Sequence, residues 1–362
     1  MWKHEATRGV EAEETPSSAV RQGGVVHLGS LPYTEPRGFL PTRHPWNLDY
    51  TAGGSSGGAA SAVAAGLCPV AHGSDGGGSL RGPAACCGLV GIKPARGRVS
   101  HAPVGDRQSG ISSDGPLACT VTDAAALLDI MSGYIPGNPY WLPESESFLA
   151  ATQTDPQPLR IAFSLAVSPV GEAAAEIQQS VIEIVELLAM MGHVVEPDCP
   201  DFSELVEPFI QVWSAGVAAA GLPLEALSPM NGWIAQQSGH AGEYLQAVTK
   251  MQIVARQIVQ FFDAVDVLVL PTYMHPPIRI GEWSQLEPEA TLRQIIHWIA
   301  PCPPFNASGL PAIALPTGFD SRDLPRSVQL VGKPAAESTL FSLAAQIESA
   351  QPWSHHRPAV AA

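Results

Sequence analysis

The stretch GGSSGGAASAVAAGLCPVAHGSDGGGSLRGPAACCGLVGIKPARGRVS, residues 53–100, decides the fold of this chain. Within it, three consecutive glycines, Gly76, Gly77 and Gly78, stand directly before Ser79. A glycine costs roughly 0.5–1 kcal/mol relative to alanine inside a regular element, so three together indicate backbone that must stay free of side chains. The alanines of GGSSGGAASAVAAGL predict a buried helix, and PVAHGSD predicts a short strand that leads into the glycines.

The glycines do not match a nucleotide-binding site. A P-loop has a lysine and then serine or threonine directly after its glycines, and this loop has no lysine. A dinucleotide-binding fingerprint opens a helix, and Pro83 would interrupt that helix. We therefore expect no nucleotide cofactor, and none of any other kind.

An oxyanion hole is the chemistry that the glycines fit better. Acyl transfer needs backbone N–H groups that converge where negative charge develops, and residues without Cβ let the substrate approach them. Gly76, Gly77, Gly78 and Ser79 offer such groups, with a hydroxyl at the end of the run. A serine is a weak nucleophile until a base takes its proton, and none of the eleven histidines stands in a recognisable triad context.

The segment GGSSGG offers a competing nucleophile, because it satisfies G-x-S-x-G at Ser55 and at Ser56. The nucleophile elbow of an α/β-hydrolase follows an apolar strand, and HPWNLDYTA is not such a strand. An esterase of this kind predicts a histidine within hydrogen-bond reach of one of these serines. The Ser-x-x-Lys pattern is absent, because none of the four lysines stands three residues after a serine.

Composition excludes several classes of protein. With 362 residues, 45% of them hydrophobic, the chain is long enough for one large α/β domain or two smaller ones. A net charge of −15 makes nucleic acid and acidic membrane surfaces poor partners. The first residues lack the apolar core of a signal peptide, and no apolar run is as long as a membrane span, so we expect a cytoplasmic protein.

The six cysteines predict no metal site, because none forms a C-x-x-C pair. Cys86 and Cys87 are adjacent and invite interpretation as a redox switch. Two small buried residues are the favoured interpretation. This cysteine usage is typical of a reducing compartment.

Short apolar runs alternate with amphipathic stretches along the rest of the chain, which indicates an α/β layered domain. In 172–192, for example, Ile177, Val181, Ile184 and Leu188 share one helical face. The predicted strands lie at 25–28, 159–164, 193–197, 266–271, 311–316 and 327–332, and the predicted helices at about 122–132, 172–192, 203–220, 242–264, 288–299 and 335–350. The proline-rich stretch 31–52 predicts a loop, residues 1–18 a disordered polar segment, and 356–362 a tail.

The segment 53–100 resembles the signature segment of the amidase signature family. HPWNLDYTAGGSSGG, GPLACTVTDAAALLDIMSG, LVLPTYMHPP and PFNASGLPAIALPTGF resemble further family segments, so the likeness covers most of residues 19–355. The resemblance implies one large α/β/α domain over 19–355, whose mixed central sheet is covered by helices. It also implies hydrolysis of a carbon–nitrogen bond in a small-molecule amide, by a protein that can form a homodimer.

The resemblance also implies a Ser–cis-Ser–Lys triad. Ser79 matches the nucleophile that forms the acyl-enzyme, and Ser55 matches the bridging serine, whose peptide bond is cis in the family. The N–H groups of Gly76, Gly77, Gly78 and Ser79 match the oxyanion hole. Asp75 and Arg81 match positions that we expect to brace the loop, with Ser56 in support. Ser55 as a helix N-cap and Ser79 as a turn serine remain the structural alternatives.

One departure from the family concerns the lysine. In the family it lies on an early strand, further upstream of GGSSGG than this chain extends. Lys3 is too close to the serines, and Lys93 in GIKPARG matches a downstream position. We therefore expect an N-terminally incomplete domain with crippled turnover, or else an inactive amidase-fold remnant or binding protein.

The substrate is the least determined feature. WIAPCPPFNASG (298–309) matches a region that often contributes to the acyl pocket, so Cys302 is a candidate pocket residue; a packed core cysteine is the alternative. The sequence of residues 73–88 resembles that of family members that act on small linear or cyclic amides, including nylon-oligomer hydrolases. Subunits of tRNA-dependent amidotransferases are less similar.

Overall fold

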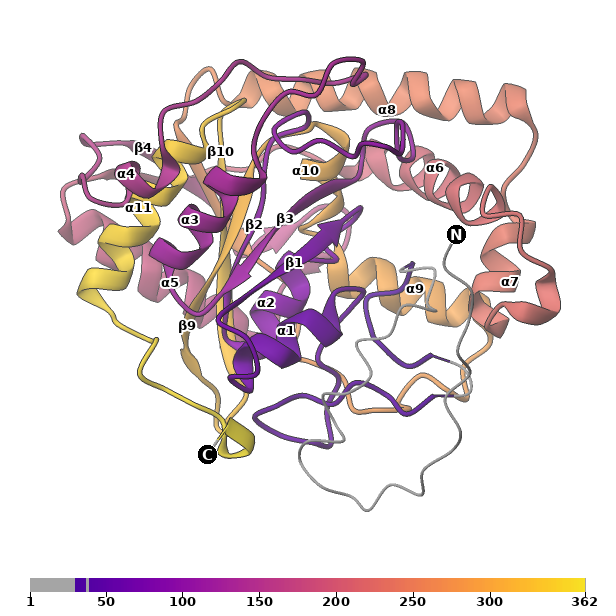
Figure 1. Cartoon of the computed structure of the whole chain (residues 1–362), viewed down its shortest axis with the longest axis horizontal. Coiled ribbons are helices and arrows are strands. Elements are labelled where there is room, and N and C mark those ends of the chain that lie inside the picture. The colour runs from indigo at the N-terminus through magenta and orange to yellow at the C-terminus, as the bar shows by residue number, and fades with distance from the viewer. Residues whose placement is uncertain (1–29, 37–38, 362) are drawn as a thin grey trace.

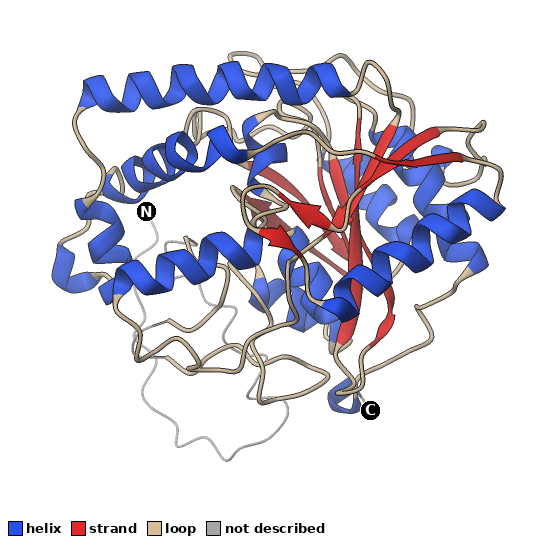
Figure 2. Cartoon of the chain, turned by 180° about the vertical axis from the view of Figure 1, so that it is seen from behind, coloured by secondary structure: helices blue, strands red, loops and turns tan. Residues whose placement is uncertain are grey.

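An eight-stranded mixed sheet runs through the middle of the folded molecule, with helices on both of its faces (Figures 1 and 2). The computed structural model describes residues 30–36 and 39–361, so the predicted polar segment 1–18 and the predicted strand at 25–28 lie outside the described residues. The strand order is β1-β3-β2-β9-β10-β8-β4-β7. The strands are β1 (Val70–Asp75), β2 (Val90–Lys93), β3 (Ser113–Ala118), β4 (Arg160–Phe163), β7 (Val194–Pro197), β8 (Val267–Pro271), β9 (Ala312–Phe319) and β10 (Pro325–Gly332).

The sheet changes from antiparallel to parallel partway across. Every pair from β1 to β8 is antiparallel, whereas β8, β4 and β7 run parallel to one another. The chain passes from β4 to β7 through α5 (Ala175–Met190), and from β7 to β8 through α6 (Val206–Ala218), α7 (Pro229–Gln236) and α8 (Ala241–Phe261). Parallel strands require such long crossover connections. The α/β/α architecture with a mixed central sheet is therefore confirmed.

The strands bury side chains on both faces with a period of two. Val267 and Val269 of β8 pack in one core with helices α3, α4, α5 and α11. Leu268 and Leu270 pack in a second core with α6, α8 and α10 on the opposite face. A third cluster joins α1, α2, α7 and α9 to that same face through Ala314.

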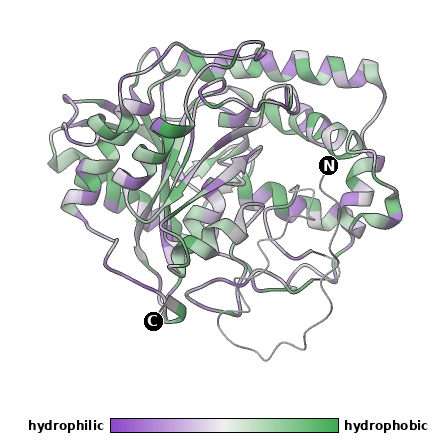
Figure 3. Cartoon of the chain, viewed as in Figure 1, coloured by the Kyte–Doolittle hydropathy of each residue, from purple (hydrophilic) through white to green (hydrophobic). Residues whose placement is uncertain are grey.

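Helices form where the amphipathic stretches predict them. The predicted helices correspond to α1 (Gly57–Ala64), α3 (Val121–Met131), α5 (Ala175–Met190), α6 (Val206–Ala218), α8 (Ala241–Phe261), α9 (Pro288–Ile299) and α11 (Glu337–Ala350). Figure 3 shows hydrophilic and hydrophobic residues alternating along α8, which buries only one stripe of its surface. The same holds for α5, where Ile177, Val181, Ile184 and Leu188 are buried as expected.

Several short elements were not expected from the sequence. They are α2 (Arg81–Cys87), α4 (Phe148–Ala151), α7 (Pro229–Gln236), α10 (Pro303–Ala307), strand β3, and the hairpin of β5 (Ala166–Val167) and β6 (Gly171–Glu172). The prediction that Pro83 interrupts a helix was wrong. Pro83 lies in the first turn of α2, where no intrahelical acceptor awaits its missing N–H.

Two expectations about the cysteines and the membrane can be compared with the structure. All six cysteines are free, and Cys86 and Cys87 are buried in α2, as the favoured interpretation predicts. Among the described residues, no helix combines the length and the apolar character needed to cross a membrane.

Candidate active site

Ser79 lies in a tight loop between β1 and α2. β1 ends at Asp75 and α2 begins at Arg81, so the glycines fill the link between them. Gly78 has φ +118°, which side chains rarely allow, and a Cβ there would lie 2.8 Å from Cβ of Cys302. A glycine is therefore required at this position by its conformation and by its surroundings.

Asp75 holds the loop through one carboxylate. It accepts hydrogen bonds from the backbone N–H groups of Gly78 (2.7 Å), Leu80 (3.3 Å) and Arg81 (3.3 Å). It also accepts from Nε and Nη2 of Arg81, both at 2.9 Å, and both side chains are completely buried. Burial alone would raise the pKa of Asp75, but the Arg81 guanidinium and a hydrogen bond from Asn306 hold that pKa well below its usual range.

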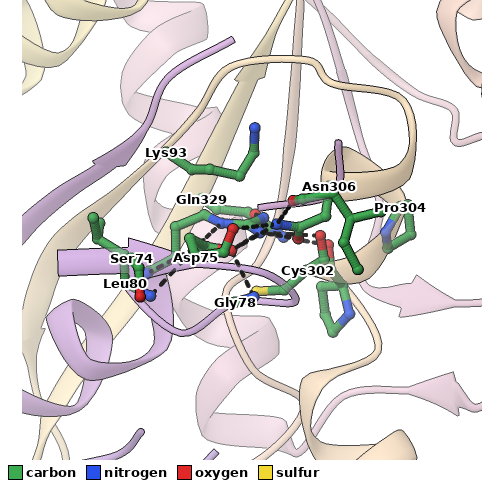
Figure 4. A network of polar contacts seen from close by, with 12 residues as sticks. Ser74, Asp75, Gly78, Leu80, Lys93, Cys302, Pro304, Asn306 and Gln329 are labelled. Atoms are coloured by element: carbon green, nitrogen blue, oxygen red, sulfur yellow. Dashed lines mark hydrogen bonds and ion pairs between the residues drawn. The ribbon is translucent and has the colours of Figure 1, made fainter. Parts of the chain in front are cut away.

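Hydrogen bonds from Arg81 extend this network to β10 and α10. Figure 4 shows the network, with Asp75, Gln329 and Asn306 labelled. Nη1 of Arg81 donates to Oε1 of Gln329 at 3.0 Å, and its Nη2 donates to Oδ1 of Asn306 at 2.7 Å and to the carbonyl of Cys302 at 3.1 Å. Nδ2 of Asn306 in turn donates to the backbone carbonyl of Asp75 at 2.8 Å and to its Oδ1 at 2.9 Å. Asp75 and Arg81 are thus tied to the loop and to each other by hydrogen bonds, and both side chains are fully buried.

The segment GGSSGG runs against this loop. The Gly54–Ser55 peptide bond is cis, as the resemblance implies. The N–H of Ser56 donates to the carbonyl of Ser79 at 3.0 Å. The Ser56 hydroxyl also accepts from the N–H of Ser74 and donates to its carbonyl, both at 3.2 Å. Ser56, the residue after Ser55, thus links the GGSSGG segment to the loop that carries Ser79.

The structure leaves three of the four predicted oxyanion donors available. The N–H of Gly78 is already donated to Asp75. Among the described residues, the N–H groups of Gly76, Gly77 and Ser79 have no acceptor. Gly78 is therefore removed from the predicted oxyanion-hole donors, because its N–H is already hydrogen-bonded to the Asp75 carboxylate.

No base is hydrogen-bonded to Ser55 or Ser79 within residues 30–36 and 39–361. The hydroxyl of Ser56 pairs with Ser74 rather than with a histidine, so the esterase alternative lacks the contact it predicts. Of the lysines, Lys250 and Lys333 pair with acidic residues, and Lys3 is outside the described residues. Lys93 is buried and donates to the carbonyl of Pro94 at 3.0 Å.

A cavity of about 980 Å³ opens over the loop. Gly76, Gly77, Gly78 and Ser79 form part of its wall, and helices α6 and α9 supply most of the opposite wall. The side chains from these two helices are largely apolar: Val206, Phe209, Ile210, Trp213, Leu292, Ile295, Ile296 and Ile299. In the described part of the chain, Arg107 is the one charged residue that lines this cavity, so it suits a largely neutral ligand.

Comparison with known proteins identifies the family. A family model described as Amidase matches residues 23–341. The chain belongs to this amidase family. A putative amidase of Synechocystis sp. is 56% identical over 322 residues, which cover 89% of this chain and 63% of that protein. The chain thus spans under two thirds of that relative's length.

Solved structures share the fold, and a further relative is similar in sequence. A 6-aminohexanoate cyclic dimer hydrolase complexed with substrate matches with a TM-score of 0.87 and 31% identity, over 92% of this chain and 75% of that one. The 6-aminohexanoate-cyclic-dimer hydrolase of Pseudomonas sp. (strain NK87) is 35% identical, over 91% of this chain and 73% of that protein. A bacterial aryl acylamidase of the amidase signature family matches with a TM-score of 0.78 and 28% identity, over 90% and 71% of the two chains.

One predicted site residue of this amidase-family chain is corrected by the structure. Cys302 does not line the cavity, because its side chain is fully buried beneath Gly78 and donates to the carbonyl of Thr272 at 3.2 Å. Burial raises the pKa of its thiol to about 12, so it stays protonated near neutral pH. The alternative of a packed core cysteine is the one that holds.

Sequence reasoning missed Asn306 and Gln329, the two amides that complete the network around Arg81. Both are buried, and a buried amide needs partners for its polar atoms. The only sequence signal was an isolated amide in each of the apolar segments PPFNASG and SVQLVG.

Proposed function

We propose that this chain binds a small, largely neutral amide and cleaves its carbon–nitrogen bond through an acyl-Ser79 intermediate. The Ser79 oxygen attacks the amide carbon, and the carbonyl oxygen becomes an oxyanion at the N–H groups of Gly76, Gly77 and Ser79. The carbon–nitrogen bond breaks as the amine nitrogen takes a proton. Water then hydrolyses the serine ester and releases a carboxylic acid. The observation that carries the proposal is the set of unpaired N–H groups beside a serine that faces the cavity.

Ser55 is proposed to relay the Ser79 proton. The backbone N–H of the next residue, Ser56, donates a hydrogen bond to the carbonyl of Ser79. This contact holds the two serine segments side by side, which supports a relay between them. The relay must end on a base, and none of the described residues contacts Ser55 in that role. Removal of one member of a serine triad costs about 10⁴–10⁶ in kcat, so we propose that fast turnover requires a base in contact with Ser55.

A second candidate function is ligand binding without turnover. The same lack of a described base favours it, while the cavity itself remains intact. Its ligand is proposed to be an apolar amide, in line with the α6 and α9 walls. The names of the relatives, an aryl acylamidase and a cyclic dimer hydrolase, suggest aryl amides and small linear or cyclic amides as the first compounds to test.

The test uses purified protein with simple aryl amides and with a fluorophosphonate probe. Wild type is compared with Ser79→Ala and with Ser147→Ala, an exposed serine outside the cavity. Slow turnover and labelling that vanish only in Ser79→Ala support the proposed hydrolysis. Binding of an apolar amide by wild type that neither labels nor turns over supports the second candidate. Labelling or turnover that survives Ser79→Ala refutes the assignment of Ser79.

A further inference from the structure

We propose that Gln108 determines substrate specificity at this site, by pairing its carboxamide with a second neutral amide group of the substrate. The proposal rests on the proposed function, since it takes the cavity over Ser79 as the substrate site. The ligand class is accordingly a diamide, linear or cyclic. Nothing in the sequence motifs singles out Gln108, and its role emerges only from where the fold places it.

The loop that carries Gln108 is held in an unusual conformation. Gln108 and Ser109 both have φ 55°, in the left-handed region that residues with side chains rarely adopt. The hydroxyl of Ser109 is hydrogen-bonded to that of Tyr244 on α8 at 2.6 Å. On the other side, Arg107 pairs with Asp114 of β3 at 3.4 Å. Neighbours on both sides therefore fix the position of Gln108 at the cavity wall.

The Gln108 side chain lies between α6 and the nucleophile loop. A Cβ on Gly216 of α6 would lie 2.1 Å from its Nε2 and 2.7 Å from its Cδ. The carboxamide thus occupies the space that a side chain at position 216 would need. On the other side, its Oε1 lies 3.5 Å from the place of a Cβ on Gly76, one of the proposed oxyanion donors. A substrate group that extends from the loop toward α6 therefore meets the carboxamide.

The carboxamide has no protein partner among the residues that the structure describes. It nevertheless lines a cavity whose walls from α6 and α9 are apolar. A glutamine amide offers one acceptor oxygen and two donor hydrogens, which match the N–H and C=O of another amide in either orientation. A ligand that covers this half-buried carboxamide without pairing it loses affinity, whereas a ligand with a second amide does not.

Charge argues for a neutral amide over a carboxylate. Arg107 is the charged residue closest in sequence, and Asp114 already pairs with it. Asp114 also faces His72 and His101, both at 3.7 Å, so its negative charge is shared among several partners. A carboxylate at Gln108 would find no unpaired cation among the described cavity residues.

The experiment measures binding in the Ser79→Ala background, so that it does not depend on turnover. Two ligands of equal length are compared by calorimetry: a linear diamide, and its analogue in which the second amide is replaced by methylene groups. We expect the diamide to bind about tenfold more tightly. Gln108→Leu should abolish that preference, and the exposed Gln179→Leu on α5 should retain it.

Gly216→Ala provides a second, independent variant. It keeps Gln108 but displaces the carboxamide, so it should also remove the preference, with an unchanged circular dichroism spectrum as the folding control. The proposal is overturned if Ser79→Ala shows no preference for the diamide, binds neither ligand, or keeps the preference with Leu at position 108. Failure of the proposed function reads out separately, as wild type that neither turns over nor labels while the Gln108-dependent preference persists.

Discussion

Replacing Asp75 with asparagine tests whether a buried ion pair holds the loop that carries Ser79 in place. Asparagine keeps the shape of the side chain but turns an NH₂ group or a neutral oxygen toward the Arg81 guanidinium. Arg81 would then be a fully buried cation without its carboxylate, since its other partners, Gln329, Asn306 and the Cys302 carbonyl, are neutral. Breaking a buried pair by removing one partner costs about 3–5 kcal/mol, so we expect Asp75→Asn to lose that much unfolding free energy.

The assay is urea unfolding between pH 3 and pH 8. Asp75 has a pKa well below its usual range in the folded protein, so its contribution is fully present above about pH 4. That contribution is lost as the pH falls through the lowered folded value. The difference between wild type and Asp75→Asn should therefore be constant from pH 5 to pH 8 and should shrink in more acid solution.

Asp129→Asn is the matched control. Asp129 is likewise a hydrogen-bond acceptor, with three donors at the start of α4, but it has no ion-pair partner among the described residues. Its replacement should cost only about 1 kcal/mol. A double-mutant cycle with Arg81→Met should show a coupling energy of about 2 kcal/mol or more. An Asp75→Asn loss no larger than the control, or a coupling near zero, would refute the reasoning.

Two further predictions concern single buried groups. Burial, and then the charge of Arg81, lowers the pKa of Lys93 from 10.5 to about 7. Between pH 7 and pH 10.5 the Lys93 amine carries its proton in the unfolded chain but not in the folded one, so the folded state becomes more stable as the pH rises. From pH 6 to pH 10.5 the unfolding free energy of wild type should therefore increase by on the order of 4 kcal/mol relative to that of Lys93→Met. A pH-independent difference between the two proteins in urea unfolding would contradict this. A Cβ on Gly82 would lie 1.6 Å from the Tyr273 hydroxyl, so Gly82→Ala should lose about 3 kcal/mol in the same assay. Gly232→Ala, with 3.8 Å of clearance in α7, should be neutral or slightly stabilising, and equal effects of the two would count against the contact.

The sequence predicts those elements whose pattern is local. The period of apolar residues places α5, α8 and α9 within a few residues of their bounds, because burial of one helical face needs that spacing. Strand β3 escapes this reasoning, since its sequence SDGPLA contains glycine and proline and is typical of a turn. Gly115 is nevertheless required there, because a Cβ would lie 2.1 Å from the carbonyl of Ile92. That requirement comes from a neighbouring strand and has no local signature.

The candidate site divides in the same way. The loop that carries Ser79, its glycines and the Asp75–Arg81 ion pair come from one continuous segment with a recognisable motif. The rest of the site comes from residues far away in the sequence: Asn306 and Gln329 behind the loop, and Gln108 and α6 across the cavity. The misassignment of Cys302 has this origin, because its position in the sequence suggests the pocket region and only the packing beneath Gly78 shows that it faces away.

This division has a physical consequence for how such a site changes its substrate. Asp75 and Arg81 are fully buried, so they fix the loop through contacts that no substrate touches, and their replacement lowers the unfolding free energy. Gln108 and the apolar side chains of α6 and α9 face the cavity, so their replacement changes which groups are left unpaired by a ligand. Substitutions of Asp75 or Arg81 should therefore lower the unfolding free energy and weaken the binding of every ligand to the same extent. Substitutions of Gln108 or of the apolar side chains of α6 and α9 should reorder the protein's ligands while the fold and the reactivity of Ser79 remain.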